Sequence, residues 1–297
     1  MPELPEVEVV RAGLDPAVSG ATVTGVEILD QRSLRRHIGA AFADELVGRR
    51  LIAAVRRGKF LWFPLDDGRA LTAHLGMSGQ MLLRHPGETD RFTRVVLALE
   101  HPEHGELVVN FADQRIFGGL AIDPLVVTTD GRPAGHAGER TADPLLPERV
   151  AHIARDALDE YLDEGRVIAR IRASRSGVKR LLLDQTVVSG IGNIYADEAL
   201  WGAMIAPEQP GVSLTDGDVG RILEEVRTVL RKALVEGGTS FDAQYVNVNG
   251  QAGYFAHSLN AYGRDGEACR RCGATIVRVA FANRSSHYCP VCQAPRD

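Results

Sequence analysis

The first residues of the chain, MPELPEVE, place a proline at position 2 with two carboxylates, Glu3 and Glu6, close behind it. Initiator methionine is normally trimmed before a residue as small as proline, which would leave Pro2 as a free secondary amine. An α-amino group has a pKa near ~7.8, so roughly one in seven is unprotonated at pH 7. Such an amine can attack a carbonyl carbon and form a Schiff base. An acidic helix start is the alternative, because proline and carboxylates both favour a first helical turn.

Four cysteines close the chain as two Cys-x2-Cys pairs separated by sixteen residues: Cys269, Cys272, Cys289 and Cys292. In a chain without a secretory signal this spacing indicates zinc rather than disulfides, because a reducing cytoplasm keeps thiols free. Four cysteine ligands leave no open coordination position, so we expect one structural zinc ion that does not activate water. The residues between the pairs predict two strands that turn at Ala282 and Asn283, with Arg284 near the tip. A zinc ribbon with a basic tip is typical of nucleic-acid binding.

The segment LLLDQTVVSGIGNIYADEALW predicts a helix that ends near Gln185, a glycine-bearing turn over 189–192, and a second helix that runs to Trp201 with Asn193 as its cap. Exposed amides at a helix start bind anions, so this turn is a candidate phosphate site. A plain helical hairpin is the alternative interpretation. The turn lacks the Gly-Lys-Ser/Thr ending of a nucleotide-binding loop, so we expect no nucleotide cofactor.

Two motifs of the amino-terminal half carry further candidates. RRGKF places Lys59 inside an otherwise apolar strand pattern, and HLGMSG places Met77 between glycines on a loop. Met77, with Arg115 and Phe117 of DQRIFG, supplies an apolar tip, a cation and an aromatic ring. These residue types enter a base stack and fill the space that an extruded nucleotide leaves. Methionine and phenylalanine are individually more often core residues, and the glycine-bounded setting is what favours the DNA role.

The elements that must position these residues fall into successive parts. Residues 21–120 alternate short β-branched or aromatic segments with turn residues, which predicts a mostly antiparallel β-sandwich or barrel. Residues 5–14 predict a leading helix whose apolar face holds the amino terminus against the β layer. Turn formers with little periodicity indicate a linker over 131–147. Helical periodicity follows, most clearly over 215–237.

The bulk properties of the 297 residues narrow the class of protein. No apolar run approaches the ~20 residues of a membrane span, and the acidic start lacks the regions of a signal peptide. We therefore expect a cytoplasmic protein without a membrane partner. The net charge is −5, yet residues 49–59 and 166–180 are acid-free basic runs, and residues 262–297 carry six arginines and three acids. Local fields of this kind steer a polyanion, although solvated surface charge is the alternative for each run.

The motifs, in this order and over nearly the whole chain, resemble those of bacterial formamidopyrimidine-DNA glycosylases, within the formamidopyrimidine-DNA glycosylase and endonuclease VIII family. The resemblance rests on PELPEVE, RRGKF, HLGMSG, DQRIFG, VVSGIGNIYADEALW, GGTSF, GYFAHSLNAYGR and the four-cysteine finger. The opening LPEVE is more similar to these enzymes than to endonuclease VIII, which usually begins PEGPE.

The resemblance implies an α+β multidomain fold: an antiparallel β-sandwich with a leading helix, a helix-two-turns-helix domain and a zinc β-hairpin. We expect the catalytic β-sandwich domain over 1–130, the linker over 131–147, the helix-two-turns-helix DNA-binding domain over 148–243 and the C-terminal segment with the finger over 244–297. The implied partner is double-stranded DNA that contains a damaged base, bound by a monomer without an obligate protein partner. In a bacterium this places the protein on the nucleoid.

The resemblance also implies catalytic roles. Pro2 would attack the anomeric carbon of the sugar, displace an oxidised or ring-opened purine (8-oxoguanine or a formamidopyrimidine) and form a Schiff base. Elimination of both flanking phosphates would then cut the strand. Glu3 would protonate the ring oxygen of the sugar, Glu6 would order the site, and Lys59 would hold a phosphate beside the lesion.

The remaining implied roles concern DNA binding. Asn193 and Arg284 would contact the same backbone as Lys59, and His74 would add a backbone contact, with a structural role as the alternative. Lys179 matches a lysine associated with the processing of oxidised guanine, and a phosphate-facing surface lysine is the alternative. The void-filling trio would be Met77, Arg115 and Phe117.

Two departures from the family pattern bear on DNA affinity and on the choice of substrate. Ile116 stands where the family often has a second arginine, so we expect weaker and less salt-sensitive DNA binding. Residues 242–253 lie where the family carries a lesion-capping loop, and they assign no lesion. An endonuclease VIII-like enzyme for oxidised pyrimidines is therefore one alternative function, and a non-catalytic zinc-ribbon DNA-binding protein is another.

Overall fold

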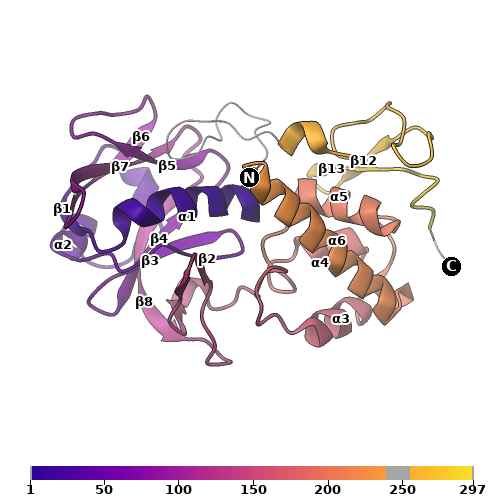
Figure 1. Ribbon diagram of the computed structural model, residues 1–297, viewed down its shortest axis with the longest axis horizontal. Helices are drawn as coiled ribbons and strands as arrows, with labels where there is room; N and C mark the ends of the chain where they lie inside the picture. Colours follow the sequence, from indigo (N-terminus) through magenta and orange to yellow (C-terminus); the bar gives the residue numbers. More distant parts are fainter. Residues whose placement is uncertain (1, 239–254, 296–297) are drawn as a thin grey trace. The chain divides into compact units, whose positions relative to one another are not determined.

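The computed structural model describes residues 2–238 and 255–295 (Figure 1), so the expected lesion-capping loop lies outside the described residues. The chain divides into two compact units, one of Met1–His152 with Gly237–Gly253 and one of Ile153–Glu236 with Tyr254–Asp297. Among the described residues, no helix combines the length and the apolar character that crossing a membrane requires.

The first unit begins with helix α1 (Leu4–Val18), which is longer at both ends than the predicted 5–14. Pro5 lies in its first turn, where the missing N–H costs nothing. Leu4, Val7 and Leu14 have no exposed surface, so one face of the helix is fully buried. This burial, more than helix propensity, fixes the start of α1 and with it the residues that precede it.

Two antiparallel sheets make up the rest of this unit, as the sequence predicted. The smaller sheet has the strand order β1 (Thr22–Ile28), β6 (Thr93–His101), β7 (Gly105–Asp113) and β5 (Gly79–Arg84). The larger sheet has the order β10 (Arg140–Thr141), β9 (His136–Ala137), β2 (Val55–Arg57), β3 (Phe60–Pro64), β4 (Arg69–His74), β8 (Gly119–Val127) and β11 (Leu145–Pro147). Short helices η1 (Gln31–Leu34), α2 (Phe42–Leu46) and η2 (Glu148–Val150) complete the unit.

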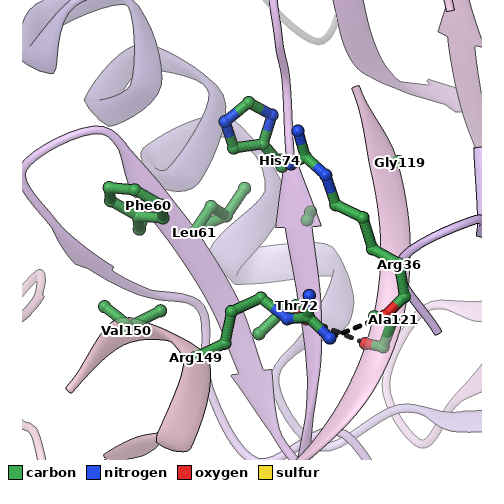
Figure 2. A pocket seen from close by; sticks show the side chains of 10 residues that line it. Arg36, Phe60, Leu61, Thr72, His74, Gly119, Ala121, Arg149 and Val150 are labelled. Atoms are coloured by element: carbon green, nitrogen blue, oxygen red, sulfur yellow. Dashed lines mark hydrogen bonds between the residues drawn. The ribbon is translucent and has the colours of Figure 1, made fainter. Parts of the chain in front are cut away.

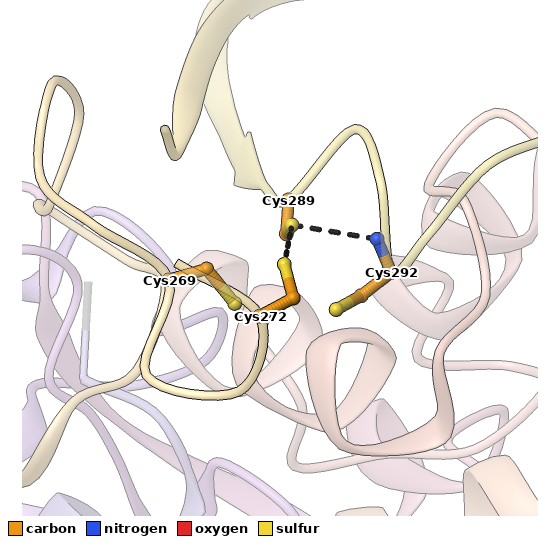
Figure 3. A group of neighbouring side chains, drawn as sticks. All are labelled: Cys269, Cys272, Cys289 and Cys292. Atoms are coloured by element: carbon orange, nitrogen blue, oxygen red, sulfur yellow. Dashed lines mark hydrogen bonds between the residues drawn. The ribbon is translucent and has the colours of Figure 1, made fainter. Parts of the chain in front are cut away.

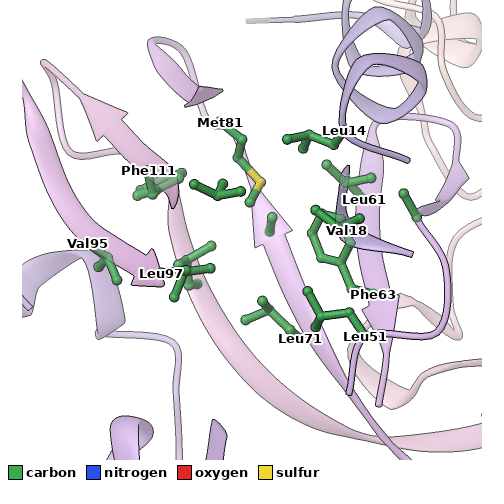
Figure 4. Packing of buried hydrophobic residues seen from close by; sticks show 14 of the residues in the cluster. Leu14, Val18, Leu51, Leu61, Phe63, Leu71, Met81, Val95, Leu97 and Phe111 are labelled. Carbon is green, nitrogen blue, oxygen red and sulfur yellow. The ribbon is translucent and has the colours of Figure 1, made fainter. Parts of the chain in front are cut away.

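The core of the first unit is one apolar cluster to which α1 and both sheets contribute (Figure 4). Leu14 of α1, Phe63 and Leu71 of the larger sheet, and Met81 and Phe111 of the smaller sheet are each at most 2% exposed. A shared core of this kind makes helix and sheets one body, so α1 holds its amino end at a fixed place on the sandwich.

Residues 131–147 differ from the predicted linker, because they contribute β9, β10 and β11 to the larger sheet. Strands of two or three residues are too short to show a period of two, which is why the sequence pattern did not predict them. Gly135 lets the backbone approach closely here, since a Cβ at that position would lie 2.3 Å from the Arg56 carbonyl oxygen. The boundary between the compact units falls at 152–153.

The second unit is helical and ends in a two-stranded hairpin. Its elements are α3 (Glu164–Arg172), α4 (Val178–Leu183), α5 (Asn193–Ala203), η3 (Gly211–Ser213), α6 (Asp216–Val235), η4 (Phe255–Ser258), β12 (Val277–Phe281) and β13 (Arg284–Tyr288). Helix α6 confirms the prediction over 215–237: the Thr215 hydroxyl accepts the N–H of Asp218 at 3.1 Å, and Asp218 accepts the N–H of Thr215 at 3.0 Å. The hairpin turns at Ala282, as predicted.

Candidate functional site

The amino terminus is ordered by the start of α1. The N–H of Glu3 donates to Oε2 of Glu6 at 2.9 Å, which fixes the backbone immediately after Pro2. Both carboxylates are buried, at 3% and 8% exposure. Gly238 of the GGTSF motif lies against the same group, because a Cβ there would be 3.0 Å from Oε1 of Glu6. The predicted nucleophile thus directly precedes a rigid, carboxylate-rich helix start.

Lys59 lies in the turn between β2 and β3, not inside a strand as the sequence predicted. Gly58 has a positive φ of 55°, and this left-handed conformation ends β2 before the lysine. The side chain of Lys59 is only 9% exposed. This burial restricts the side chain, which suits a group that must bind one phosphate.

A buried ion cluster that the sequence did not reveal links α1 to the strand before Lys59. Oε2 of Glu8 accepts from Nε of Arg56 at 2.8 Å, and Nη1 of Arg56 donates to the Gly58 carbonyl oxygen at 3.4 Å. Burial opposes ionisation of Glu8, yet hydrogen bonds from His136 and Arg11 hold its pKa well below the usual range. The cluster therefore keeps the turn of Lys59 in register with the helix that carries Glu3.

The three predicted void-filling side chains lie on two loops of the first unit. Met77 is 40% exposed on the loop between β4 and β5, and Phe117 is 49% exposed on the loop between β7 and β8. Arg115 is also exposed, and within the described part of the chain its guanidinium has no hydrogen-bond or ion-pair partner. Large apolar groups at this exposure are available to enter a base stack. Their role in DNA binding stays a prediction.

His74 lines a pocket on the face of the larger sheet opposite the core (Figure 2), with Arg36, Phe60, Thr72, Arg149 and Val150 among its other lining residues. The Arg36 side chain reaches toward the His74 ring. Burial, followed by the charges of Arg36 and Arg35, lowers the pKa of His74 to about 4. The neutral ring accepts the N–H of Gly76 through Nδ1 at 3.1 Å, so its contribution to this loop is a hydrogen bond and not a charge.

We expect His74 to make the protein less stable as the pH falls. The His74 ring has its ordinary pKa of 6.5 in the unfolded chain, whereas its pKa in the folded protein is about 4. Stability is therefore complete above pH 6.5 and falls by about 2 kcal/mol between pH 6.5 and pH 5. His74→Asn, which keeps an acceptor for Gly76, should remove this part of the pH dependence.

Urea denaturation at pH 7 and pH 5 measures the difference in the free energy of unfolding. His104→Asn is the control, because His104 is exposed on the turn between β6 and β7. An equal loss of stability between the two pH values in wild type and His74→Asn would contradict the expectation.

The second unit brings Asn193, Lys179 and the hairpin together. Asn193 is the first residue of α5, one position later than the predicted cap, and Gly192 is the cap. Its Nδ2 donates to the Ser285 carbonyl oxygen at 3.0 Å, and Nζ of Lys179 donates to the same oxygen at 3.1 Å. Arg284, one residue before Ser285, is exposed at the hairpin tip. The helix start that could bind a phosphate is thus joined directly to the tip residue.

Lys179 is fully buried, so the alternative of a phosphate-facing surface lysine is wrong. Its Nζ lies 2.7 Å from Oδ1 of Asp197, which is also fully buried, and 4.7 Å from the centroid of the Phe281 ring. Asp197 further accepts the hydroxyl of Ser286 at 3.0 Å and the N–H of His287 at 2.9 Å. The buried pair therefore anchors β13 to α5.

Lys179→Met should lower the free energy of unfolding by about 3–5 kcal/mol, because it leaves the Asp197 carboxylate buried without its counter-charge. Urea denaturation monitored by circular dichroism measures the change. Arg166→Ala removes a cation from the exposed surface of α3 and should change stability by less than about 0.5 kcal/mol. Equal effects of the two variants would show that the buried Lys179–Asp197 pair contributes no more to stability than one exposed cation.

A second buried carboxylate, Glu198 of α5, also holds the segment that leads to the finger. It accepts the backbone N–H groups of Asn260, Ala261 and Tyr262 at 2.8, 2.8 and 2.9 Å. Burial raises the pKa of Glu198 despite these bonds. The sequence shows this glutamate only as one acid in a helix, and nothing in its spacing indicates three amide partners.

The four cysteines form a metal site (Figure 3), as the sequence predicted: their Sγ atoms all lie within 4.8 Å of one another. Zinc bound tetrahedrally at about 2.3 Å places sulfur atoms about 3.8 Å apart, so the cluster fits a structural zinc ion. The indole N–H of Trp201 donates to Sγ of Cys269 at 3.4 Å, and the Arg271 guanidinium lies 4.1 Å from the Trp201 ring centroid. Trp201 thereby attaches the finger to α5.

Three family models match successive parts of the chain. Residues 1–120 match the formamidopyrimidine-DNA glycosylase N-terminal domain, residues 153–244 match the formamidopyrimidine-DNA glycosylase H2TH domain, and residues 266–295 match the zinc finger found in FPG and IleRS. A Leifsonia xyli protein named formamidopyrimidine-DNA glycosylase is 57% identical over 298 residues, which cover 99% of each chain. A Nocardioides protein of the same name is 56% identical over 100% of this chain and 96% of its own.

Two solved structures are similar to this chain over nearly its whole length. The MutM (FPG) protein of Thermus thermophilus has a TM-score of 0.79 and 34% identity and covers 100% of both chains. A variant of the Lactococcus lactis FPG protein, solved in complex with a Fapy-dG containing DNA, has a TM-score of 0.81 and 30% identity over 99% of this chain and 100% of its own. With all three family domains matched in order and relatives above half identity over their whole length, the chain belongs to the formamidopyrimidine-DNA glycosylase family.

Proposed function

We propose that this chain is a bifunctional DNA glycosylase and AP lyase of base excision repair that removes oxidised or ring-opened purines from double-stranded DNA. The observation that carries the proposal is Pro2, placed directly before the buried Glu3 and Glu6 pair at a fixed helix start. Relatives named for this activity cover the whole chain, and one solved neighbour binds a Fapy-dG containing DNA. We place its action on the nucleoid of a bacterial cytoplasm.

In the proposed reaction the lone pair of the Pro2 nitrogen attacks C1′ of the sugar, and the bond from C1′ to the purine nitrogen breaks. The base leaves with that electron pair and takes up the N–H proton that the alkylated Pro2 nitrogen releases, which leaves a lone pair on that nitrogen. Glu3 protonates the ring oxygen, the ring opens, and an iminium forms between C1′ and Pro2. Loss of the two flanking phosphates by β- and δ-elimination then cuts the strand.

We give the other residues the roles that the family resemblance implies, and the position of each one supports its role. Lys59 holds a phosphate beside the lesion from its tight turn, and Glu6 keeps the Glu3 amide fixed. Asn193 and the exposed Arg284 bind backbone from the second unit, and Lys179 supports both through the Ser285 carbonyl. The zinc ion, bound by Cys269, Cys272, Cys289 and Cys292, keeps the hairpin folded. Met77, Arg115 and Phe117 replace the extruded nucleotide in the stack.

A duplex with one formamidopyrimidine or one 8-oxoguanine tests the proposal. We expect loss of the base and cleavage that leaves phosphates on both sides of the gap. A thymine glycol duplex of the same sequence separates the endonuclease VIII-like alternative, which predicts the opposite preference. Binding to all three duplexes without any cleavage would favour the non-catalytic DNA-binding protein.

A further inference from the structure

One buried carboxylate joins the two loops that carry the void-filling trio. Asp113, at the end of β7, has no exposed surface. Its Oδ1 accepts the hydroxyl of Ser78, next to Met77, at 2.5 Å and the N–H of Arg115 at 3.1 Å. Its Oδ2 accepts the N–H of Gly118 at 2.8 Å. The two loops therefore share a single set of charge-assisted hydrogen bonds.

The backbones of the two loops also touch directly. A Cβ on Gly76, whose φ is +61°, would lie 2.4 Å from the Gly118 nitrogen and 2.6 Å from the Phe117 carbonyl carbon. A Cβ on Gly118 would lie 2.4 Å from the His74 carbonyl oxygen. No side chain fits at either glycine, so the loops form one platform and do not move independently.

Arg35 clamps this platform from outside. It follows η1, and its guanidinium donates from Nη1 to the Ile116 carbonyl oxygen at 2.6 Å and from Nη2 to the Phe117 carbonyl oxygen at 3.0 Å. Ile116 has a φ of +54°, a left-handed conformation that is strained for a β-branched residue. A strained loop persists only when its surroundings hold it, and the two bonds from Arg35 do so at its most strained point.

We propose that Arg35 is a positioning residue for base excision. It holds Arg115 and Phe117 in the geometry in which they fill the space of an extruded nucleotide, while Asp113 keeps Met77 in register with them. This inference rests on the proposed function. Because the void-filling trio is already in position, it loses little conformational freedom when it enters the stack. The hydrogen bonds from Arg35 therefore favour extrusion of the damaged nucleotide.

The test compares base excision with cleavage at a site that has no base. A duplex with a preformed abasic site has no base to unstack, so its cleavage depends less on the void-filling trio. For Arg35→Ala we expect kcat/KM to fall about tenfold on a formamidopyrimidine duplex and less than about threefold on the abasic duplex. Arg35→Lys keeps a donor and should lie between Arg35→Ala and wild type.

Arg32→Ala is the matched control. Arg32 is an exposed arginine of η1 whose side chain bonds only Asp30 among the residues that the structure describes, so the variant removes the same charge without touching the platform. It should leave the ratio between the two substrates unchanged. Thermal unfolding of each variant should match wild type, because Arg35 is exposed and its two bonds hold a loop and not the apolar core.

Each outcome has a distinct meaning. Equal losses on both duplexes would identify Arg35 as a phosphate contact and overturn the positioning role. Wild-type activity of Arg35→Ala on both duplexes would also overturn it. Failure of the wild-type protein to cut either duplex would instead overturn the proposed function.

Discussion

A loss of about a hundredfold in the covalent complex that borohydride traps on lesion DNA is the expected result of Pro2→Gly. Borohydride reduces the C=N bond between enzyme and sugar, so the trapped amount reports the iminium directly. Glycine keeps an amine but loses the ring that sets its direction before Glu3. Misplacement of a reacting group by about 1 Å is enough for a loss of this size.

The control for this variant is Pro210→Gly, which removes an exposed proline from the second unit and should trap as wild type does. Affinity for a duplex with a non-cleavable abasic analogue should stay within about twofold, because Pro2 binds no phosphate in the proposed mechanism. Undiminished trapping by protein with an acetylated amino terminus would rule out Pro2 as the nucleophile. Intact-mass measurement establishes whether Met1 has been removed.

Zinc removal has the second large expected effect. Cys292→Ser, or chelation of the wild-type protein, should weaken binding to lesion DNA by about a hundredfold. Apparent zinc-binding energies of about 10–16 kcal/mol in small fingers are largely folding energies, so the hairpin should unfold without the metal. The exposed Arg284 would then no longer be held beside Asn193.

Fluorescence anisotropy of a labelled duplex measures the affinity, and the fluorescence of Trp201 reports the finger, because its indole N–H donates to Cys269. Addition of zinc should restore both signals in chelated wild type but not in Cys292→Ser. Zinc-free protein with unchanged affinity would show that the finger takes no part in DNA binding.

Much of the fold could be predicted because local chemistry determines it. The spacing of four cysteines indicates one tetrahedral site wherever the finger packs. Helix α6 carries its start signal in Thr215 and Asp218 and its packing face in an apolar stripe. Strands β9 to β11 have neither a period nor a cap, and only their pairing to distant strands makes them strands.

In the candidate site, too, some features are visible in the local sequence and others arise only from tertiary contacts. Pro2, Glu3 and Lys59 are recognisable by residue type and motif, whereas the groups that hold them in place are not. Asp197 is one of two adjacent acids in a helix, and only tertiary structure shows that it pairs with the buried Lys179. Similarly, nothing in the sequence around Asp113 indicates that its carboxylate joins two loops.

The hydrogen bond from the Glu3 amide to Glu6 gives the proposed nucleophile a very short tether. A single residue spans at most about 3.6 Å, so the Pro2 nitrogen can sample only a small volume around the fixed amide. The Pro2 nitrogen therefore has a nearly fixed position, and the bound DNA must place C1′ inside that small volume. One extra residue at the amino terminus would both block the amine and extend the chain by about 3.6 Å, more than the placement of a reacting group tolerates.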